Sequence, residues 1–361
     1  MSSKSLRYHG CSLFRNRLTT SILSGKTLII KDIRSDHEAP GLLDYEASYL
    51  RLLDKLLDGS FIEINETGTL LKFRPGILIG GSIQHDCPSS RSIGWFIEGI
   101  IPLIVFAKNP VSIQFTGITN DEMDISVDVF KSVTLPLMRN FGIEGMTLNI
   151  KRRGAAPNGG GLVEFTCPIV RELKPLNVTD AGLIKRIRGI AFCAKISPTI
   201  LTRVVDSARA VLNEYIPDVY IHTDHYRGAD SGASAGYSLA LFAESTTGVL
   251  LSSECTASPG GRQLPEDIGR HGALQLLEEI WKGGVIDSAH QSLVLLLMTM
   301  SPEDVCKVRF GSSLTDQSVE TLRLLKDAFG VVFKIKEDPE THTLQLSCLG
   351  IGYKNMSRKA T

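Results

Sequence analysis

The sequence lacks cysteines at the spacing of a metal site and lacks any apolar run long enough to cross a membrane. Its seven cysteines are scattered, with no C-x-x-C pair, which excludes a zinc ribbon and gives no disulfide framework. The most apolar runs, Gly99–Ala107 and Ser292–Met300, are about half the length of a membrane span. The stretch Met1–Arg17 is polar and basic, unlike a secretory signal. These absences predict a soluble intracellular protein in a reducing compartment.

An excess of charge of one sign is also missing. Lys and Arg together number 39, as do Asp and Glu, so the 361-residue chain has no global basic field. Any nucleic-acid binding must therefore come from local clusters of cations. With 43% hydrophobic and 22% charged residues, the composition is that of a globular protein, long enough for two domains or for one large domain with an insertion.

No signature of catalysis or of a cofactor site is found. Ser24-Gly25-Lys26-Thr27 resembles the end of a P-loop, but the glycine required five residues before Gly25 is Thr20, so a strand-to-strand turn is predicted. His222-Thr223-Asp224-His225 contains the residue types of metal ligands, yet no further His or Cys lies nearby in sequence to complete a ligand set. No nucleophile has a recognisable base. We therefore predict no catalytic residue, no metal and no cofactor.

A glycine-rich loop that follows a run of cations is the most informative motif present. Lys151-Arg152-Arg153 leads into Gly154, and the loop ends in Gly159-Gly160-Gly161. Glycine lets backbone N–H groups approach an anion, and arginine offers a planar fork for phosphate oxygens. A second segment of this kind is Phe73-Arg74-Pro75-Gly76. The two segments predict a groove for a phosphate-bearing partner; the alternative is a pair of ordinary glycine hairpins beside solvated arginines.

Two further groups of cations could each have one of two roles. Lys185-Arg186-Ile187-Arg188 enters a predicted strand, where it either extends an RNA-binding surface or protects a sheet edge. Arg323 and Lys326 are three residues apart on a predicted helix and share one side of it. That pair either contacts a protein partner or is simply solvated.

The pattern of elements repeats. A helix followed by a glycine-marked hairpin is predicted three times, with the helices at Asp44–Leu57, Val127–Phe141 and Leu314–Phe329. The first two helices start roughly 80 residues apart and the third starts about 190 residues after the second, so about 100 residues form an insertion. We predict an α+β fold with a large domain at 1–179 and 265–361 and a small inserted α/β domain at 180–264.

The glycine loop resembles a motif of the RNA 3′-terminal phosphate cyclases, R-H-G-x-x-P-x-G-G-G. Ile33-Arg34 with Pro40-Gly41-Leu42, and Phe73-Arg74-Pro75-Gly76, resemble two further motifs of this family. The resemblance covers essentially the whole chain and implies three repeats of a two-helix, four-stranded unit with one small α/β insertion. Arg15, Arg34, Arg74 and Arg152 occupy family arginine positions, whereas Arg153 replaces a histidine. The resemblance thus implies a basic, anion-binding groove formed by these arginines and Gly159, Gly160 and Gly161.

The departures from the family concern its chemistry. The segment that begins E-G-G-G-Q in cyclases is here Tyr8-His9-Gly10-Cys11-Ser12, and Tyr8 is no substitute for a carboxylate. Where cyclases have the histidine that takes AMP from ATP, this chain has Gly311–Asp316. Leu314 has no lone pair, and Thr315 would need a base. The loss of both the nucleophile and the acidic residue implies that cyclase activity is absent.

This combination resembles the cyclase-like branch of the family, which is found in the eukaryotic nucleolus. The resemblance implies a nuclear, nucleolar protein of the small-subunit processome that acts in early pre-rRNA processing for 18S rRNA and the 40S subunit. The implied partners are a ribosome-biogenesis GTPase, the processome with its box C/D small nucleolar RNP, and pre-rRNA.

Two other functions stay open at this point. One is an RNA endonuclease that uses a carboxylate as base, for which Asp86, Asp121, Asp124 and Asp128 are available. The other is a pure protein-interaction module whose cleft receives a peptide of the GTPase, which the balanced charge of the chain favours over bulk RNA binding.

Overall fold

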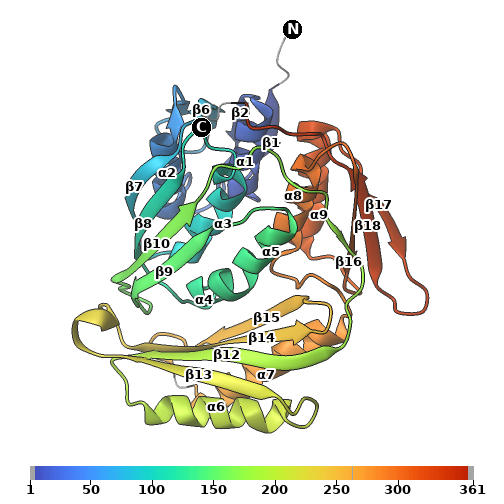
Figure 1. Cartoon of the computed structure of the whole chain (residues 1–361). Coiled ribbons are helices and arrows are strands. Elements are labelled where there is room, and N and C mark those ends of the chain that lie inside the picture. Colours follow the sequence, from blue (N-terminus) through green and yellow to red (C-terminus); the bar gives the residue numbers. More distant parts are fainter. Residues whose placement is uncertain (1–4, 262, 357–361) are drawn as a thin grey trace.

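The computed structural model describes residues 5–261 and 263–356, and it contains the same six-element unit three times (Figure 1). The chain order in each unit is strand, helix, strand, helix, strand, strand. In the first unit these elements are β1 (Leu6–His9), α1 (Phe14–Ser24), β2 (Leu28–Lys31), α2 (Asp44–Leu56), β4 (Phe61–Ile64) and β5 (Leu71–Arg74). Two short strands, β3 (Leu57–Asp58) and β6 (Ile77–Leu78), pair with each other beside this sheet.

The second and third units repeat this order. The second contains β7 (Gly81–Asp86), α3 (Ile93–Ile104), β8 (Val111–Gly117), a second helix, β9 (Thr147–Arg152) and β10 (Gly161–Cys167). The third contains β11 (Asn177–Val178), α8 (Gln291–Met300), β16 (Val305–Phe310), α9 (Asp316–Phe329), β17 (Lys334–Glu337) and β18 (Leu344–Leu349).

Sheet topology confirms the threefold repeat. The strand orders are β1-β2-β5-β4, β7-β8-β10-β9 and β11-β16-β18-β17. In each sheet the first pair is parallel and the other two pairs are antiparallel. The first helices of the units meet in the middle of the large domain, where α3 packs against both α1 and α8, and α9 packs against α1 and α8. These helices bury one face of each sheet, and the other faces point outward.

The second helix of the second unit confirms the helix expected over 127–141 to within one residue. It runs through α4 (Val127–Val129), a π-helical turn η1 (Phe130–Thr134) and α5 (Leu135–Asn140) without a gap. Pro136 at the start of α5 accounts for the wider turn, because proline has no N–H and its ring displaces the carbonyl one turn earlier.

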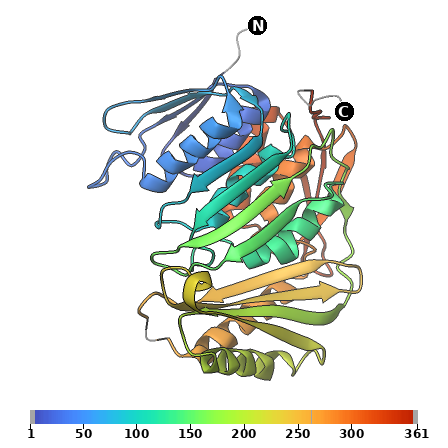
Figure 2. The ribbon, with the colours of Figure 1, turned by 60° about the vertical axis from the view of Figure 1, so that its left-hand side comes forward.

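The insertion lies between β11 and α8 of the third unit and forms a separate layer (Figure 2). Its sheet has the order β13-β12-β14-β15. The elements are β12 (Ile184–Ala194), α6 (Thr199–Leu212), β13 (Val219–Tyr226), the 3-10 turn η2 (Gly228–Ser231), β14 (Gly236–Ser245), β15 (Leu250–Thr256) and α7 (Pro265–Trp281). Because α7 packs against α6, β14 and β15, we draw the end of the inserted unit after Trp281 rather than at residue 264.

Both faces of the inserted sheet are covered by other elements. Its lower face in Figure 1 is covered by α6 and α7, and its upper face packs on the α4–η1–α5 segment through a small apolar cluster. Val129 and Val133 of that segment contact Ala240 and Phe242 of β14. Across residues 5–261 and 263–356, none of the helices combines the length and apolarity needed to cross a membrane.

Candidate functional site

A pocket of about 320 Å³ lies where the first two units and the start of α9 meet. The connections β1–α1, β2–α2 and β7–α3 each contribute an arginine to its lining: Arg15 at the start of α1, Arg34 and Arg91. Tyr45 of α2 and Trp95 of α3 supply aromatic walls. The structure thus brings together two arginines that the sequence predicted, Arg15 and Arg34, with a third that it missed.

Arg15 is held against α3. The connection before it turns sharply, with Leu13 in the left-handed region at φ 49°, so that α1 begins directly at the pocket. The Arg15 guanidinium lies 4.6 Å above the Trp95 ring, donates to the Trp95 carbonyl and places Nη2 2.7 Å from a carboxylate oxygen of Glu98. Its side chain is 13% exposed, so the charge is only partly solvated.

Arg34 is paired even more completely. Its two terminal nitrogens each donate to one oxygen of Glu46 at 2.7 Å, and Nη1 also donates to the Gly41 carbonyl at 3.1 Å. Glu46 accepts a further bond from the Leu43 N–H at the start of α2. The hydrogen bonds to Glu46 raise the pKa of Arg34 above its ordinary value. Arg34 therefore fixes the start of α2 as well as lining the pocket.

Arg91 follows no glycine and belongs to no motif, which is why sequence reasoning missed it. Its guanidinium lies 5.1 Å above the Tyr45 ring, with Nη1 2.9 Å from Oδ1 of Asp124. Burial, together with the neighbouring Asp121, raises the pKa of Asp124 to about 6. The three pocket arginines therefore each have one carboxylate partner, so that the local charge is balanced and an anion must compete for the guanidinium N–H groups.

The glycine loop lies elsewhere, in a packed junction rather than in an open groove. A Cβ on Gly159, at φ 60°, would come within 2.7 Å of the Gly117 backbone, and one on Gly161 within 2.7 Å of the Thr119 side chain. A Cβ on Gly160 would lie 3.1 Å from the Ala233 nitrogen in the inserted unit. Ala233 N–H donates to the Gly159 carbonyl at 2.8 Å. The prediction that these glycines cradle a phosphate is corrected: they let the inserted unit approach β8 and β10.

Arg153 is the clearest correction to the predicted groove. It is 2% exposed and donates to both oxygens of Asp128, at 2.6 and 2.7 Å, and to Asp224 of the inserted unit at 3.1 Å. These carboxylates hold the pKa of Arg153 above its ordinary value despite burial. An external phosphate therefore does not reach this guanidinium, and its role is to join the inserted unit to the second unit.

Arg152 and Arg74 lie outside the pocket. Arg152 Nε donates to the Gly160 carbonyl at 2.5 Å, so it supports the glycine loop. Arg74 is exposed at the end of β5, beside the Phe61 ring at 5.8 Å. Because β5 is antiparallel to β2, Arg74 lies near the start of β2, whereas Arg34 follows its end. The predicted set of five arginines is thus divided among three places.

The two other cationic groups are at the surface. Arg323 and Lys326 are exposed on α9 while Leu325 beneath them is buried, as their spacing predicted; a partner contact there stays a prediction. Arg186 and Lys185 both pair with Glu244, and Arg188 pairs with Asp218. The run at the start of β12 is therefore largely neutralised.

The segment that replaces the cyclase histidine has a structural role. The Thr315 hydroxyl accepts from the Ser318 N–H at 3.2 Å and so caps α9, and Thr315 N–H donates to Gln291 at 3.0 Å. Burial raises the pKa of Tyr8 to about 12, so that its phenol stays neutral at physiological pH. The residues lining the pocket include no histidine, and the described residues contain no cluster of three or more potential metal ligands.

The carboxylates available to an endonuclease are already engaged. Asp128 pairs with Arg153, Asp124 pairs with Arg91, and Asp121 accepts from the Asp124 N–H at 2.8 Å. Asp86 accepts from the Thr116 hydroxyl on the outer side of the second sheet. None of the four lines the pocket.

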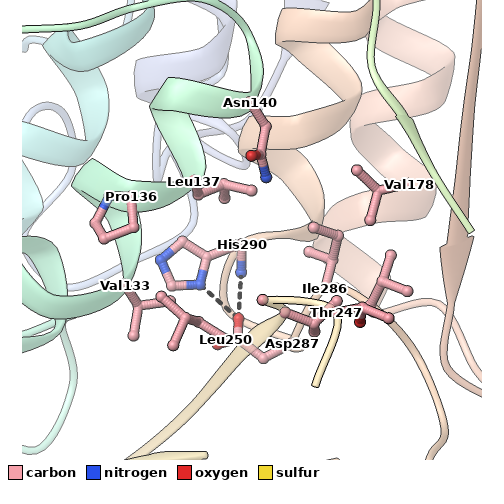
Figure 3. Close-up of a pocket in the computed structure, with 13 residues that line it drawn as sticks. Val133, Pro136, Leu137, Asn140, Val178, Thr247, Leu250, Ile286, Asp287 and His290 are labelled. Carbon is pink, nitrogen blue, oxygen red and sulfur yellow. Dashed lines mark hydrogen bonds and ion pairs between the residues drawn. The ribbon is translucent and has the colours of Figure 1, made fainter. Parts of the chain in front are cut away.

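A smaller cavity of about 110 Å³ lies between α5, β15 and α8 (Figure 3). Beside it, His290 Nδ1 lies 2.5 Å from Asp287, and His290 Nε2 lies 2.8 Å from the Thr134 hydroxyl. Asp287 also accepts from the Ser252 hydroxyl of the inserted unit at 2.6 Å. The order Thr–His–Asp is that of a hydrolase triad. Thr134, however, is fully buried, so this chain of hydrogen bonds joins the inserted unit to the large domain.

The whole chain has known relatives. The family model described as RNA 3′-terminal phosphate cyclase matches residues 6–335. A probable RNA 3′-terminal phosphate cyclase-like protein of Dictyostelium discoideum is 50% identical, with 98% of this chain and 99% of the relative covered. The human RNA 3′-terminal phosphate cyclase-like protein is 49% identical, with 98% of both chains covered.

The name of a third relative states the process in which that protein acts. It is an rRNA processing protein of Schizosaccharomyces pombe, 43% identical over 98% of both chains. These matches extend over nearly the full length of this chain, so they include both the repeated units and the insertion. This chain belongs to the RNA 3′-terminal phosphate cyclase family.

Proposed function

We propose that this chain acts in rRNA processing as a non-catalytic member of its family. In this proposal it is a nucleolar component of the small-subunit processome, where it acts in early pre-rRNA processing for 18S rRNA and 40S assembly. It binds a ribosome-biogenesis GTPase, pre-rRNA or both, next to the box C/D small nucleolar RNP. The name of the Schizosaccharomyces pombe relative supports the process, and the cyclase-like names of the other relatives support a function other than cyclisation.

The observation that carries the proposal is the composition of the arginine pocket. Arg15, Arg34 and Arg91 converge there with Tyr45 and Trp95, a set suited to an anionic group attached to a planar ring. Thr315 caps a helix and Asp124 holds Arg91, and the Cys11 thiol is the one free nucleophile among the described residues that line the pocket. Such a site binds a phosphate-bearing segment but has no histidine in that lining to act as the cyclase nucleophile.

Rescue of a depleted cell tests the proposal. A double variant, Arg15→Gln with Arg91→Gln, removes two pocket cations without adding bulk, and we expect it to accumulate 18S precursors when it replaces the endogenous protein. Each lost charge-assisted hydrogen bond weakens binding by about 1.5–3 kcal/mol. Arg74→Gln is the matched control because it removes an exposed family arginine outside the pocket. Normal precursor levels in the double variant, at normal protein abundance, would contradict the proposal.

A further inference from the structure

The outward face of the third sheet carries four cations and no carboxylate among its strand residues. On this face β16 presents Lys307 and Arg309, and β17 presents Lys334 and Lys336. In Figure 1, α8 and α9 cover the opposite face, and no described element lies on the outward side of β17 and β18. Lys307, Lys334 and Lys336 are exposed, and Arg309 is half-buried.

Strand register arranges these cations in two parallel rows that run along the strands. Lys307 and Arg309 form the row on β16, and Lys334 and Lys336 form the row on β17. Lys307 and Lys334 are both opposite Ser347 of β18, which lies between them, and Arg309 and Lys336 are both opposite Gln345. Residues opposite each other in register project from the same face. Strands lie about 4.8 Å apart and alternate residues about 7 Å apart, so the cations form a rectangle of about 10 by 7 Å.

These cations differ from those of the arginine pocket in having no partner. None of the four lies within 4.0 Å of a carboxylate oxygen in the described part of the chain. Arg309 lowers the pKa of Asp338, in the turn after β17, without forming an ion pair with it. The face therefore has a net positive charge that is open to solvent.

The corresponding faces of the other two sheets carry acids as well as cations. On the second sheet, Lys151 is paired with Glu164 at 3.2 Å, and the same face carries Asp86. On the first sheet, Lys72 is paired with Glu63 at 3.1 Å, and Arg7 and Lys31 add further cations to the face. The third sheet alone among these repeated faces combines clustered cations with an absence of acids in its strands.

We propose that the outward face of the third sheet, formed by Lys307, Arg309, Lys334 and Lys336, binds the phosphate backbone of single-stranded RNA. Adjacent cations on one strand are separated by a distance comparable to that between successive phosphates of an extended RNA strand. Ser347 and Gln345 lie between the rows and can bond ribose hydroxyls, and the exposed pair Val305 and Leu349 at one end can cover a base. The choice of RNA over an acidic peptide rests on the proposed function.

Binding of a fluorescent uridine 20-mer by the purified full-length protein, followed at several salt concentrations, tests this inference. Each phosphate contact on a single strand contributes about 0.7 to the slope of log affinity against log salt. Lys334→Gln with Lys336→Gln should therefore flatten the slope by about 1.4 and weaken binding at low salt severalfold or more. Lys307→Gln with Arg309→Gln should do the same, and the melting temperatures should stay unchanged because these side chains are exposed or nearly so.

Lys131→Gln with Arg139→Gln is the matched control, since it removes two exposed cations on η1 and α5. We expect the control to keep the wild-type slope. An unchanged slope in both face variants, an equal loss in the control, or no RNA binding by the wild type would each overturn the inference. Equally tight binding of a glutamate 20-mer would overturn the choice of RNA. If the pocket variant impairs pre-rRNA processing while the face variants bind RNA normally, the proposed function stands and this inference falls.

Discussion

Arg153 shows how a single residue can have the right chemistry for a site and yet serve another purpose. Its sequence neighbours are those of a phosphate loop, but its partners Asp128 and Asp224 lie 25 and 71 residues away along the chain. Removing one member of such a buried pair usually costs several kcal/mol, because the other charge is left without a partner. Arg153 therefore stabilises the junction between the second unit and the inserted unit.

Glu254 lies at the same junction and gives a prediction about pH. Both of its carboxylate oxygens lie 3.1 Å from the Ser126 nitrogen, and burial raises its pKa to about 8, with Asp128 and Asp121 adding to the shift. A raised pKa stabilises the folded protein at low pH, and this contribution is lost as pH rises from about 4.5 through 8. Glu254→Gln mimics the protonated form and should remove that loss.

Thermal unfolding of both proteins between pH 5 and pH 9 measures the effect. Since one pH unit between the two pKa values corresponds to about 1.4 kcal/mol, the wild type should lose up to about 4 kcal/mol relative to the variant between pH 5 and pH 8. A difference in melting temperature between wild type and variant that does not change with pH would contradict the assigned protonation state.

At the scale of elements, the glycine loop between β9 and β10 explains why the inserted unit can pack so closely. Its glycines lie against the backbone of Gly117 and the segment around Ala233, where a side chain would not fit. A glycine in the sequence shows that no Cβ is present, but it does not show what lies where the Cβ would be. A bound anion and a neighbouring backbone are therefore equally compatible with the glycine motif. The distinction between the two requires the position of the inserted unit.

A pair of substitutions separates close packing from backbone strain in this loop. Gly159→Ala and Gly25→Ala both place a side chain at a positive φ, of 60° and 68°, which costs about 1–2 kcal/mol in each case. Only at Gly159 does the new Cβ meet backbone, at 2.7 Å, whereas nothing lies within 4 Å at Gly25. We expect Gly159→Ala to lose a further 1–3 kcal/mol or so in thermal or denaturant unfolding. Equal losses in the two variants would show that the loop is not tightly packed.

At the scale of the whole molecule, much of the architecture could be predicted from sequence. The helix expected at Asp44–Leu57 is confirmed almost to the residue, and the hairpin of β4 and β5 follows it, as expected. The family resemblance supplied the first strand and helix of each unit. The sequence placed α7 in the large domain, whereas it packs on the inserted sheet. The spacing of apolar residues in an amphipathic helix does not indicate which sheet the helix covers.

The candidate site was less predictable than the fold. Arg15 and Arg34 could be found because they lie in family motifs, but Arg91 lies in a loop without one. Its position depends on the packing of the second unit against the first and on Asp124, 33 residues later. The tertiary fold also decides whether a cation forms an ion pair. The three pocket arginines each pair with a carboxylate, whereas the cations on the outward face of the third sheet do not.

The proposed function requires that this chain does not transfer a nucleotide to itself, and a labelling experiment measures this. The purified protein is incubated with ATP labelled at the α-phosphate and a divalent cation, then resolved on a denaturing gel beside an active cyclase of the same family. We predict no label on this chain, because Thr315 caps α9 and the pocket offers no histidine. A covalent AMP adduct on this chain, abolished by a single substitution, would contradict the account and identify a surviving nucleophile.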